Sequence, residues 1–127
     1  MTLPVRRSLQ GQVEKDLKAK MVFVGGPRQV GKTTLAKALL ADRPGYLNWD
    51  VPEHREAILK RELPDAPLWA FDELHKYRSW RNYLKGLYDL HGPAKRILVT
   101  GSARLDYYRF GGDSLQGRYH YLRLHPL

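Results

Sequence analysis

A glycine-rich stretch, GGPRQVGKTTL at residues 25–35, contains the residue types that bind a chain of phosphates. It fits the pattern G-x-x-x-x-G-K-[ST], in which glycines let successive backbone N–H groups point at one anion. The helix expected after it would aim its positive N-terminal end at the same anion. Lys32 is then expected at the β- and γ-phosphates, Thr34 at the α-phosphate and Thr33 on Mg²⁺. The full set of expected nucleotide contacts is Gly26, Pro27, Arg28, Gln29, Val30, Gly31, Lys32, Thr33 and Thr34.

Two neighbouring acids, Asp72 and Glu73, end the apolar run LWAFDE at residues 68–73. A phosphate-loop site needs a carboxylate near Mg²⁺, and Asp72 is the candidate. Glu73 is suited to orienting an attacking water, which favours a nucleoside-triphosphate hydrolase over a small-molecule kinase. The simpler interpretation of the pair is a solvated strand end. No NKxD-like guanine-reading segment occurs in the sequence, so ATP is the expected nucleotide.

A third polar cluster, TGS at residues 100–102, ends another apolar run and supplies the hydroxyls of Thr100 and Ser102. One of these hydroxyls would sense the γ-phosphate or hold the water if its strand lies beside the strands that carry the other two clusters. An ordinary turn at the end of a strand is the alternative interpretation.

The elements that must position these clusters alternate between apolar and helix-favouring segments, and this alternation predicts an α/β fold with a mainly parallel sheet. Ligands bind such sheets beyond the carboxyl ends of the strands, where all three clusters would meet. Right-handed crossovers would place helices on both faces. The expected strands are 21–25, 46–50, 68–73, 96–102 and 118–124, and the expected helices are 7–20, 32–41, 51–63 and 79–91, the last with Ser79 as its N-cap.

Composition limits the class of protein. The chain has 127 residues, the size of one domain, and no cysteine, so disulfides and cysteine metal sites are excluded. No apolar run approaches the ~20 residues of a membrane span, and the first residues lack the apolar core of a signal peptide. We therefore expect a cytoplasmic domain without a membrane partner. The net charge of +9 and the aromatic–basic run RYHYLRL also raise nucleic acid as a partner.

The sequence resembles the archaeal and bacterial AAA+-type ATPases with a DELHK-style Walker B segment. The phrases that carry the resemblance are GPRQVGKTTLAK, YLNWD, DELHKYRSWRNYLKGLYD, TGSARLD and GDSLQGRYHYLRLHPL. The resemblance runs from about residue 20 to residue 127. It implies a three-layer P-loop sandwich with a five-stranded sheet in the order 5-1-4-3-2, binding ATP and Mg²⁺.

The resemblance also implies roles for single residues. Glu73 becomes the catalytic base, and Ser102, with Thr100 as the alternative, becomes the sensor on the fourth strand. Asn48 would restrain Glu73 until a partner binds, unless it is simply a turn-favouring residue. Arg118 would be an arginine finger toward a neighbouring copy of the chain, unless it is a surface residue at the start of a strand.

In the resembled family the phrase L-x-P-L leads into a helical segment and a C-terminal domain, whereas this sequence stops at Leu127. We therefore expect one P-loop ATPase domain over residues 1–127, without the lid that closes over adenine. It would be the N-terminal part of a longer protein, with a naturally shortened gene as the alternative. Weak hydrolysis in this form follows from that expectation. The alternative function is a nucleotide-responsive module that binds nucleic acid or protein and has little turnover.

Overall fold

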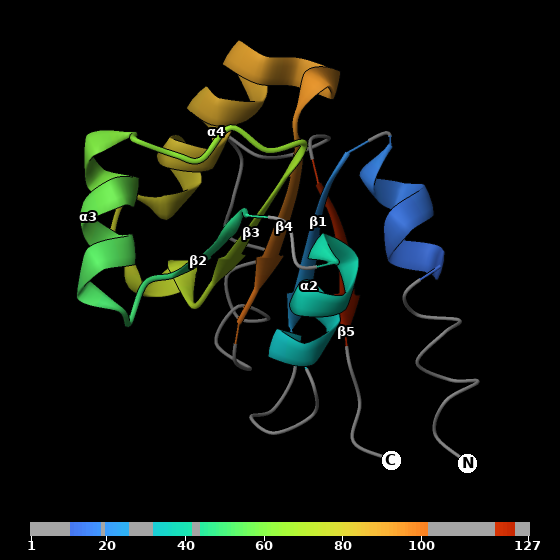
Figure 1. Ribbon diagram of the computed structural model, residues 1–127. Coiled ribbons are helices and arrows are strands. Elements are labelled where there is room, and N and C mark those ends of the chain that lie inside the picture. Colours follow the sequence, from blue (N-terminus) through green and yellow to red (C-terminus); the bar gives the residue numbers. More distant parts are fainter. Residues whose placement is uncertain (1–10, 19, 26–31, 42–43, 102–118, 124–127) are drawn as a thin grey trace.

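The computed structural model describes residues 11–18, 20–25, 32–41, 44–101 and 119–123, which form one parallel sheet between two layers of helices (Figure 1). The strands are β1 (Met21–Gly25), β2 (Tyr46–Asn48), β3 (Leu68–Asp72), β4 (Arg96–Thr100) and β5 (Tyr119–Arg123). The helices are α2 (Lys32–Leu40), α3 (Pro52–Lys60) and α4 (Trp80–His91), with short 3₁₀ turns η1 (Leu74–Lys76) and η2 (Gly92–Ala94). Residues 11–17 are also helical.

The sheet order is β2-β3-β4-β1-β5, and every pair of neighbouring strands is parallel. Read from the other edge this is 5-1-4-3-2, so the predicted topology is confirmed. β1 and β4 are neighbours although 70 residues of chain lie between Gly25 and Arg96, as crossover connections require.

Alternation along the strands divides the core into two layers, because successive side chains point to opposite faces of a sheet. Met21 and Phe23 of β1 pack with Trp80 and Leu84 of α4. Val22 and Val24 pack on the other face with α2 and the helix at residues 11–17. The three-layer sandwich predicted from the sequence is therefore confirmed.

The observed ends of the helices and of β2 match the predicted ends only in part. Pro52 begins α3, where its missing N–H costs nothing, but the helix stops at Lys60 and Arg61 takes a left-handed conformation, so the helix is shorter than predicted. Ser79 occupies the N-cap of α4 as predicted, yet its side chain makes no capping hydrogen bond. β2 is also shorter than predicted, since Trp49 and Asp50 lie in a turn after Asn48.

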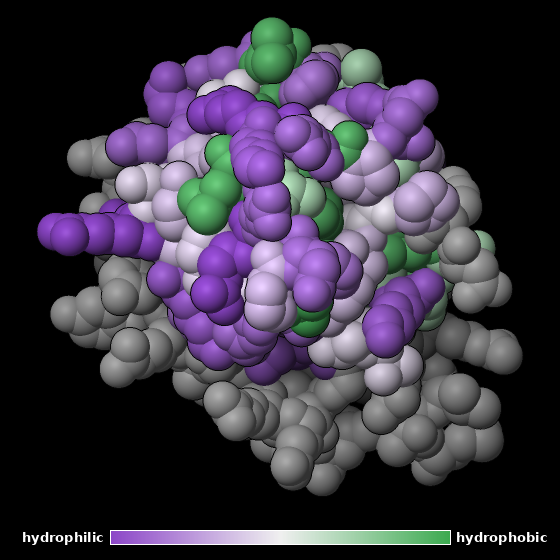
Figure 2. All heavy atoms as spheres, turned by 60° about the vertical axis from the view of Figure 1, so that its left-hand side comes forward, coloured by the Kyte–Doolittle hydropathy of each residue, from purple (hydrophilic) through white to green (hydrophobic). Residues whose placement is uncertain are grey.

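The outer face that includes α3 is mostly hydrophilic, with separate hydrophobic side chains between the polar ones (Figure 2). Among the described residues the exposed large hydrophobic side chains are Leu59 and Leu90. No helix in the described part of the chain has the length and apolar character needed to cross a membrane.

Candidate nucleotide-binding site

The site lies at the carboxyl edge of the sheet, where strand register aligns three predicted residues. Asn48 of β2 is the partner of Asp72 of β3, and Asp72 is the partner of Thr100 of β4. Partners in adjacent strands point to the same face, so the three side chains form a row beside the N-terminus of α2. The predicted convergence of Asp72 and Thr100 is therefore confirmed by the register.

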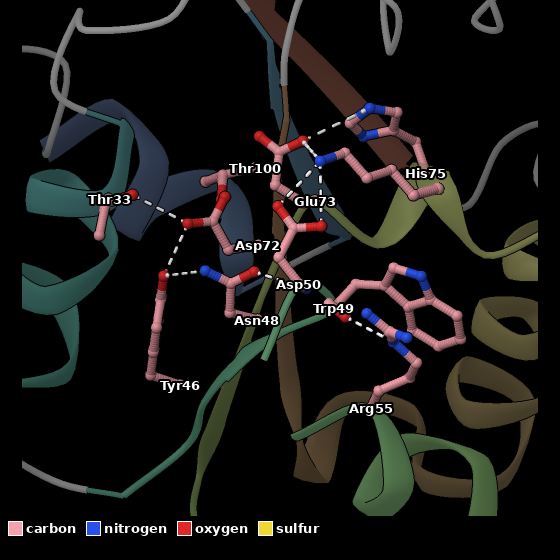
Figure 3. Close-up of polar contacts among 11 residues, drawn as sticks. Thr33, Tyr46, Asn48, Trp49, Asp50, Arg55, Asp72, Glu73, His75 and Thr100 are labelled. Atoms are coloured by element: carbon pink, nitrogen blue, oxygen red, sulfur yellow. Dashed lines mark hydrogen bonds and ion pairs between the residues drawn. The ribbon is translucent and has the colours of Figure 1, made fainter. Parts of the chain in front are cut away.

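Asp72 is the centre of this row. It is buried, and its carboxylate accepts three hydrogen bonds from hydroxyl groups (Figure 3). Oδ2 accepts from Thr33 Oγ1 at 2.8 Å and from Tyr46 Oη at 2.7 Å, and Oδ1 accepts from Thr100 Oγ1 at 2.9 Å. Hydrogen bonds to an ionised acceptor are stronger than neutral ones. The carboxylate thus joins α2, β2, β3 and β4 at one point.

One of the predicted nucleotide ligands, Thr33, lies directly at this point. Lys32 and Thr33 are the first residues of α2, and Lys32 is buried whereas Thr33 is exposed. Thr34 is also exposed. The predicted contacts from Gly26 to Gly31 lie outside the described residues, as do Ser102 and Arg118. Gly25, the last residue of β1, is placed so that a Cβ atom there would collide with the Tyr121 hydroxyl, which explains a glycine at this position.

Tyr46 is a site residue that the sequence reasoning missed. Burial, the hydrogen bond to Asp72 and the charge of Asp72 raise the pKa of Tyr46 to about 12. The Lys37 ammonium lies 5.3 Å from the centre of the same ring. A tyrosine at the start of a short strand carries no sequence signal for this role. The available clue was its spacing, because a residue two positions before Asn48 shares the face of Asn48 and Asp72.

Asn48 bonds within its own segment. Its Nδ2 donates to Tyr46 Oη at 3.2 Å, and its Oδ1 accepts from the Asp50 backbone N–H at 2.9 Å. Its own backbone N–H donates to His54 Nδ1 at 3.0 Å. The amide therefore supports Tyr46 and the turn after β2. A restraint of Glu73 by Asn48 stays a prediction.

Glu73 follows Asp72 in an unusual backbone conformation. Its φ is 61° and its ψ is 23°, a left-handed conformation that non-glycine residues seldom adopt. Such strain persists only where surrounding contacts fix the backbone. One such contact is the hydrogen bond that the Glu73 N–H donates to the Thr100 carbonyl at 2.8 Å.

The Glu73 carboxylate lies near two side chains that can carry positive charge, His75 and Lys76 (Figure 3). Its Oε2 is 3.6 Å from His75 Nε2 and 3.6 Å from Lys76 Nζ. Lys76 Nζ also contacts Asp50 Oδ1 at 3.0 Å and Oδ2 at 2.8 Å. The hydrogen bond to Asp50 and the charge of Glu73 raise the pKa of Lys76, so its ammonium form is favoured. The sequence reasoning did not assign this cluster.

The aromatic–basic run in β5 is used by the fold itself. Tyr119 stacks on Phe23 with ring centres 4.5 Å apart, and His120 Nδ1 lies 2.8 Å from Asp16 Oδ2. These contacts attach β5 to β1 and to the helix at residues 11–17. They give Tyr119 and His120 structural roles within the domain.

The comparisons with known proteins agree with this geometry. The sequence pattern of an AAA domain family matches residues 18–127. The chain belongs to this family of AAA domains. It is therefore an AAA-type P-loop ATPase domain, a class that binds nucleotide. No curated protein matches the chain.

Three solved structures of Pif1 helicases have a similar fold at 14% sequence identity. A structure of two coordinating Pif1 helicases at forked DNA has a TM-score of 0.57 and matches over 96% of this chain and 43% of that chain. Bacteroides sp Pif1 in complex with ADP-AlF4 has a TM-score of 0.55, over 95% and 41%. Bacteroides Pif1 bound to ssDNA has a TM-score of 0.52, over 95% and 41%. The chain thus spans about two-fifths of the length of these helicases.

Proposed function

We propose that this AAA domain binds ATP together with Mg²⁺ and hydrolyses the ATP slowly. The observation that carries the proposal is the contact between Thr33 and Asp72, 39 residues apart in sequence. It brings the last residue of the phosphate-loop pattern to the first acid of the Walker B segment. A phosphate-loop site needs this hydroxyl and this carboxylate on one metal ion.

The residues at the site fit Mg²⁺. This ion prefers oxygen ligands and is usually bound by one or two carboxylates plus substrate phosphates and water. Asp72 and Thr33 provide one carboxylate and one hydroxyl within 2.8 Å of each other. When bound, Mg²⁺ would neutralise charge on the phosphates and polarise them. Thr33 and Asp72 are the proposed residues that hold it.

We propose the remaining roles from the sequence pattern and the family resemblance. The backbone of residues 26–31, Lys32 and Thr34 would bind the phosphates, and the N-terminus of α2 would face them. Glu73 would orient the attacking water and accept its proton as the water oxygen bonds to the γ-phosphorus. The bond from that phosphorus to the bridging oxygen then breaks, which leaves ADP and inorganic phosphate. Ser102 or Thr100 is the proposed sensor, and Arg118 the proposed finger toward a neighbouring copy.

A titration of the chain with ATP and Mg²⁺ tests the binding. We expect Lys32→Ala to abolish binding, because it removes the cation proposed for the β- and γ-phosphates. Lys85→Ala is the control, since Lys85 pairs with Asp89 on the exposed side of α4. A folded wild-type chain without measurable affinity at millimolar ATP would refute the proposal.

A second comparison tests the role of Glu73. We expect Glu73→Gln to retain ATP binding and to lose phosphate release, whereas the exposed Glu62→Gln should retain both. Normal turnover by Glu73→Gln would remove Glu73 from the mechanism while leaving the binding site intact.

The alternative function is a nucleotide-responsive module that binds nucleic acid. Two observations favour it: the net charge of +9 and the ssDNA bound by one of the structurally similar Pif1 helicases. If it is correct, ssDNA should bind with an affinity that falls steeply as salt rises, and ATP should alter that affinity. Absence of ssDNA binding at low salt, with and without ATP, would exclude this form of the function.

A further inference from the structure

The cluster of Asp50, Glu73 and Lys76 joins the end of β2 to the residue that follows β3. Lys76 Nζ lies between the two carboxylates, within 3.0 Å of both Asp50 oxygens and 3.6 Å from Glu73 Oε2. One ammonium is therefore shared by an exposed acid and by the acid proposed as the catalytic base.

Local structure explains why Lys76 reaches Glu73. The 3₁₀ turn η1 begins directly after Glu73 and ends at Lys76. Lys76, three residues after Glu73, is the last residue of this short turn, and its Nζ lies 3.6 Å from Glu73 Oε2. The backbone supports the same arrangement, because the Lys76 N–H donates to the Glu73 carbonyl at 3.1 Å. The left-handed conformation of Glu73 sets the start of the turn.

The environment of each charge differs. The Glu73 side chain is 16% exposed, whereas those of Lys76 and Asp50 are 37% and 50% exposed. The contact with Glu73 is thus the less hydrated of the two, and the contact with Asp50 is the shorter. A change at Asp50 is expected to redistribute Lys76 toward Glu73.

We propose that Lys76 is a positioning residue that holds the Glu73 carboxylate in a resting orientation, and that Asp50 weakens this restraint by sharing the ammonium. The inference rests on the proposed role of Glu73 in orienting water. A carboxylate oxygen that faces an ammonium is less available to accept a proton from water. Release of Glu73 from Lys76 would therefore increase turnover, and removal of Asp50 would decrease it.

Two substitutions with opposite expected effects test the restraint. Lys76→Met keeps most of the unbranched side chain and removes its charged end. It should raise kcat about two- to fivefold, because exposed ion pairs are weak. Asp50→Asn should lower kcat by a similar factor. The KM for ATP should stay unchanged in both, since neither residue is proposed to contact the nucleotide. Lys85→Met, the control, should change neither constant.

Several outcomes would overturn the restraint. A lower kcat in Lys76→Met would show that Lys76 assists Glu73 and does not restrain it. An unchanged kcat in both variants, or absent turnover in both while ATP still binds, would show that the ion pair does not limit the reaction.

A measurement on the nucleotide-free chain separates this inference from the proposed function. The nitrogen resonance of the Lys76 ammonium should shift in Glu73→Gln and in Asp50→Asn, but not in Glu62→Gln. If the chain fails to bind ATP, the proposed function is wrong, and this resonance still decides whether the contact exists. A resonance that is insensitive to Glu73→Gln would refute the contact itself.

Discussion

Asp72 offers a test in which two substitutions at one position separate geometry from charge. Its carboxylate accepts three hydroxyl donors, from Thr33, Tyr46 and Thr100. An asparagine has one carbonyl oxygen and one NH₂ group in the same positions. With its oxygen at the place of Oδ2 it would accept from Thr33 and Tyr46, and its NH₂ would donate to Thr100, whose hydroxyl also accepts.

We therefore expect Asp72→Asn to lower the free energy of unfolding by only about 1 kcal/mol, because charge-assisted bonds become neutral ones of similar geometry. Asp72→Ala should cost about 2–3 kcal/mol, since Thr100 is 1% exposed and would lose its acceptor away from water. Thr33 is exposed, so its hydroxyl regains water and adds little to the loss. Asp72→Ala also removes the cost of burying a carboxylate, so the total loss of stability stays below the sum of three hydrogen bonds.

Urea unfolding of wild type and both variants measures these differences, with and without ATP and Mg²⁺. Nucleotide at 100 times its Kd should stabilise the wild type by about 2.7 kcal/mol. Both variants should lose most of this increment, because an amide or a methyl group does not replace a carboxylate near Mg²⁺. If Asp72→Asn is as unstable as Asp72→Ala without nucleotide, the reasoning from hydrogen-bond geometry is refuted.

Three further predictions concern single side chains. Gly86→Ala should raise the free energy of unfolding by about 0.5–1 kcal/mol, since it lies within α4 and a Cβ there meets only ordinary contacts; thermal unfolding checks this. Gly45→Ala, the matched opposite, should destabilise by more than ~1 kcal/mol, because φ is +135° and the Cβ would collide with the Leu68 carbonyl. Raised to about 12, the pKa of Tyr46 exceeds that of an unfolded tyrosine, so stability should fall as pH rises from 10 to 12. Tyr46→Phe should flatten that fall in alkaline urea titrations, and an equal slope in both proteins would contradict the assigned environment.

Sequence reasoning predicted the part of the site that depends on strand ends. The apolar runs located β1, β3 and β4, and the rule for the carboxyl ends of parallel strands predicted that Asp72 and Thr100 lie at one edge of the sheet. The sheet order came from the family resemblance, and the observed pairings match it. These features depend on patterns that extend over many residues.

What could not be predicted depends on single torsions and on register. The role of Tyr46 requires that Asn48 and not a neighbour pairs with Asp72, and a one-residue slip would turn Tyr46 to the other face. The left-handed conformation of Glu73 has no signature in the sequence, because Glu rarely adopts it. The contact of Lys76 with Glu73 depends on that conformation, so the contact could not be predicted from the sequence either.

The three hydroxyl donors of Asp72 come from residues 39, 26 and 28 positions away along the chain. Contacts between residues so far apart in sequence form late and slowly during folding, because the chain loses the entropy of closing a long loop before the contact stabilises it. The Asp72 carboxylate, proposed to bind Mg²⁺, would thus have no complete set of partners until most of the sheet has assembled. A partly folded chain would therefore not bind nucleotide. ATP binding during refolding would indicate that the native topology has formed, and not merely a local helix or turn.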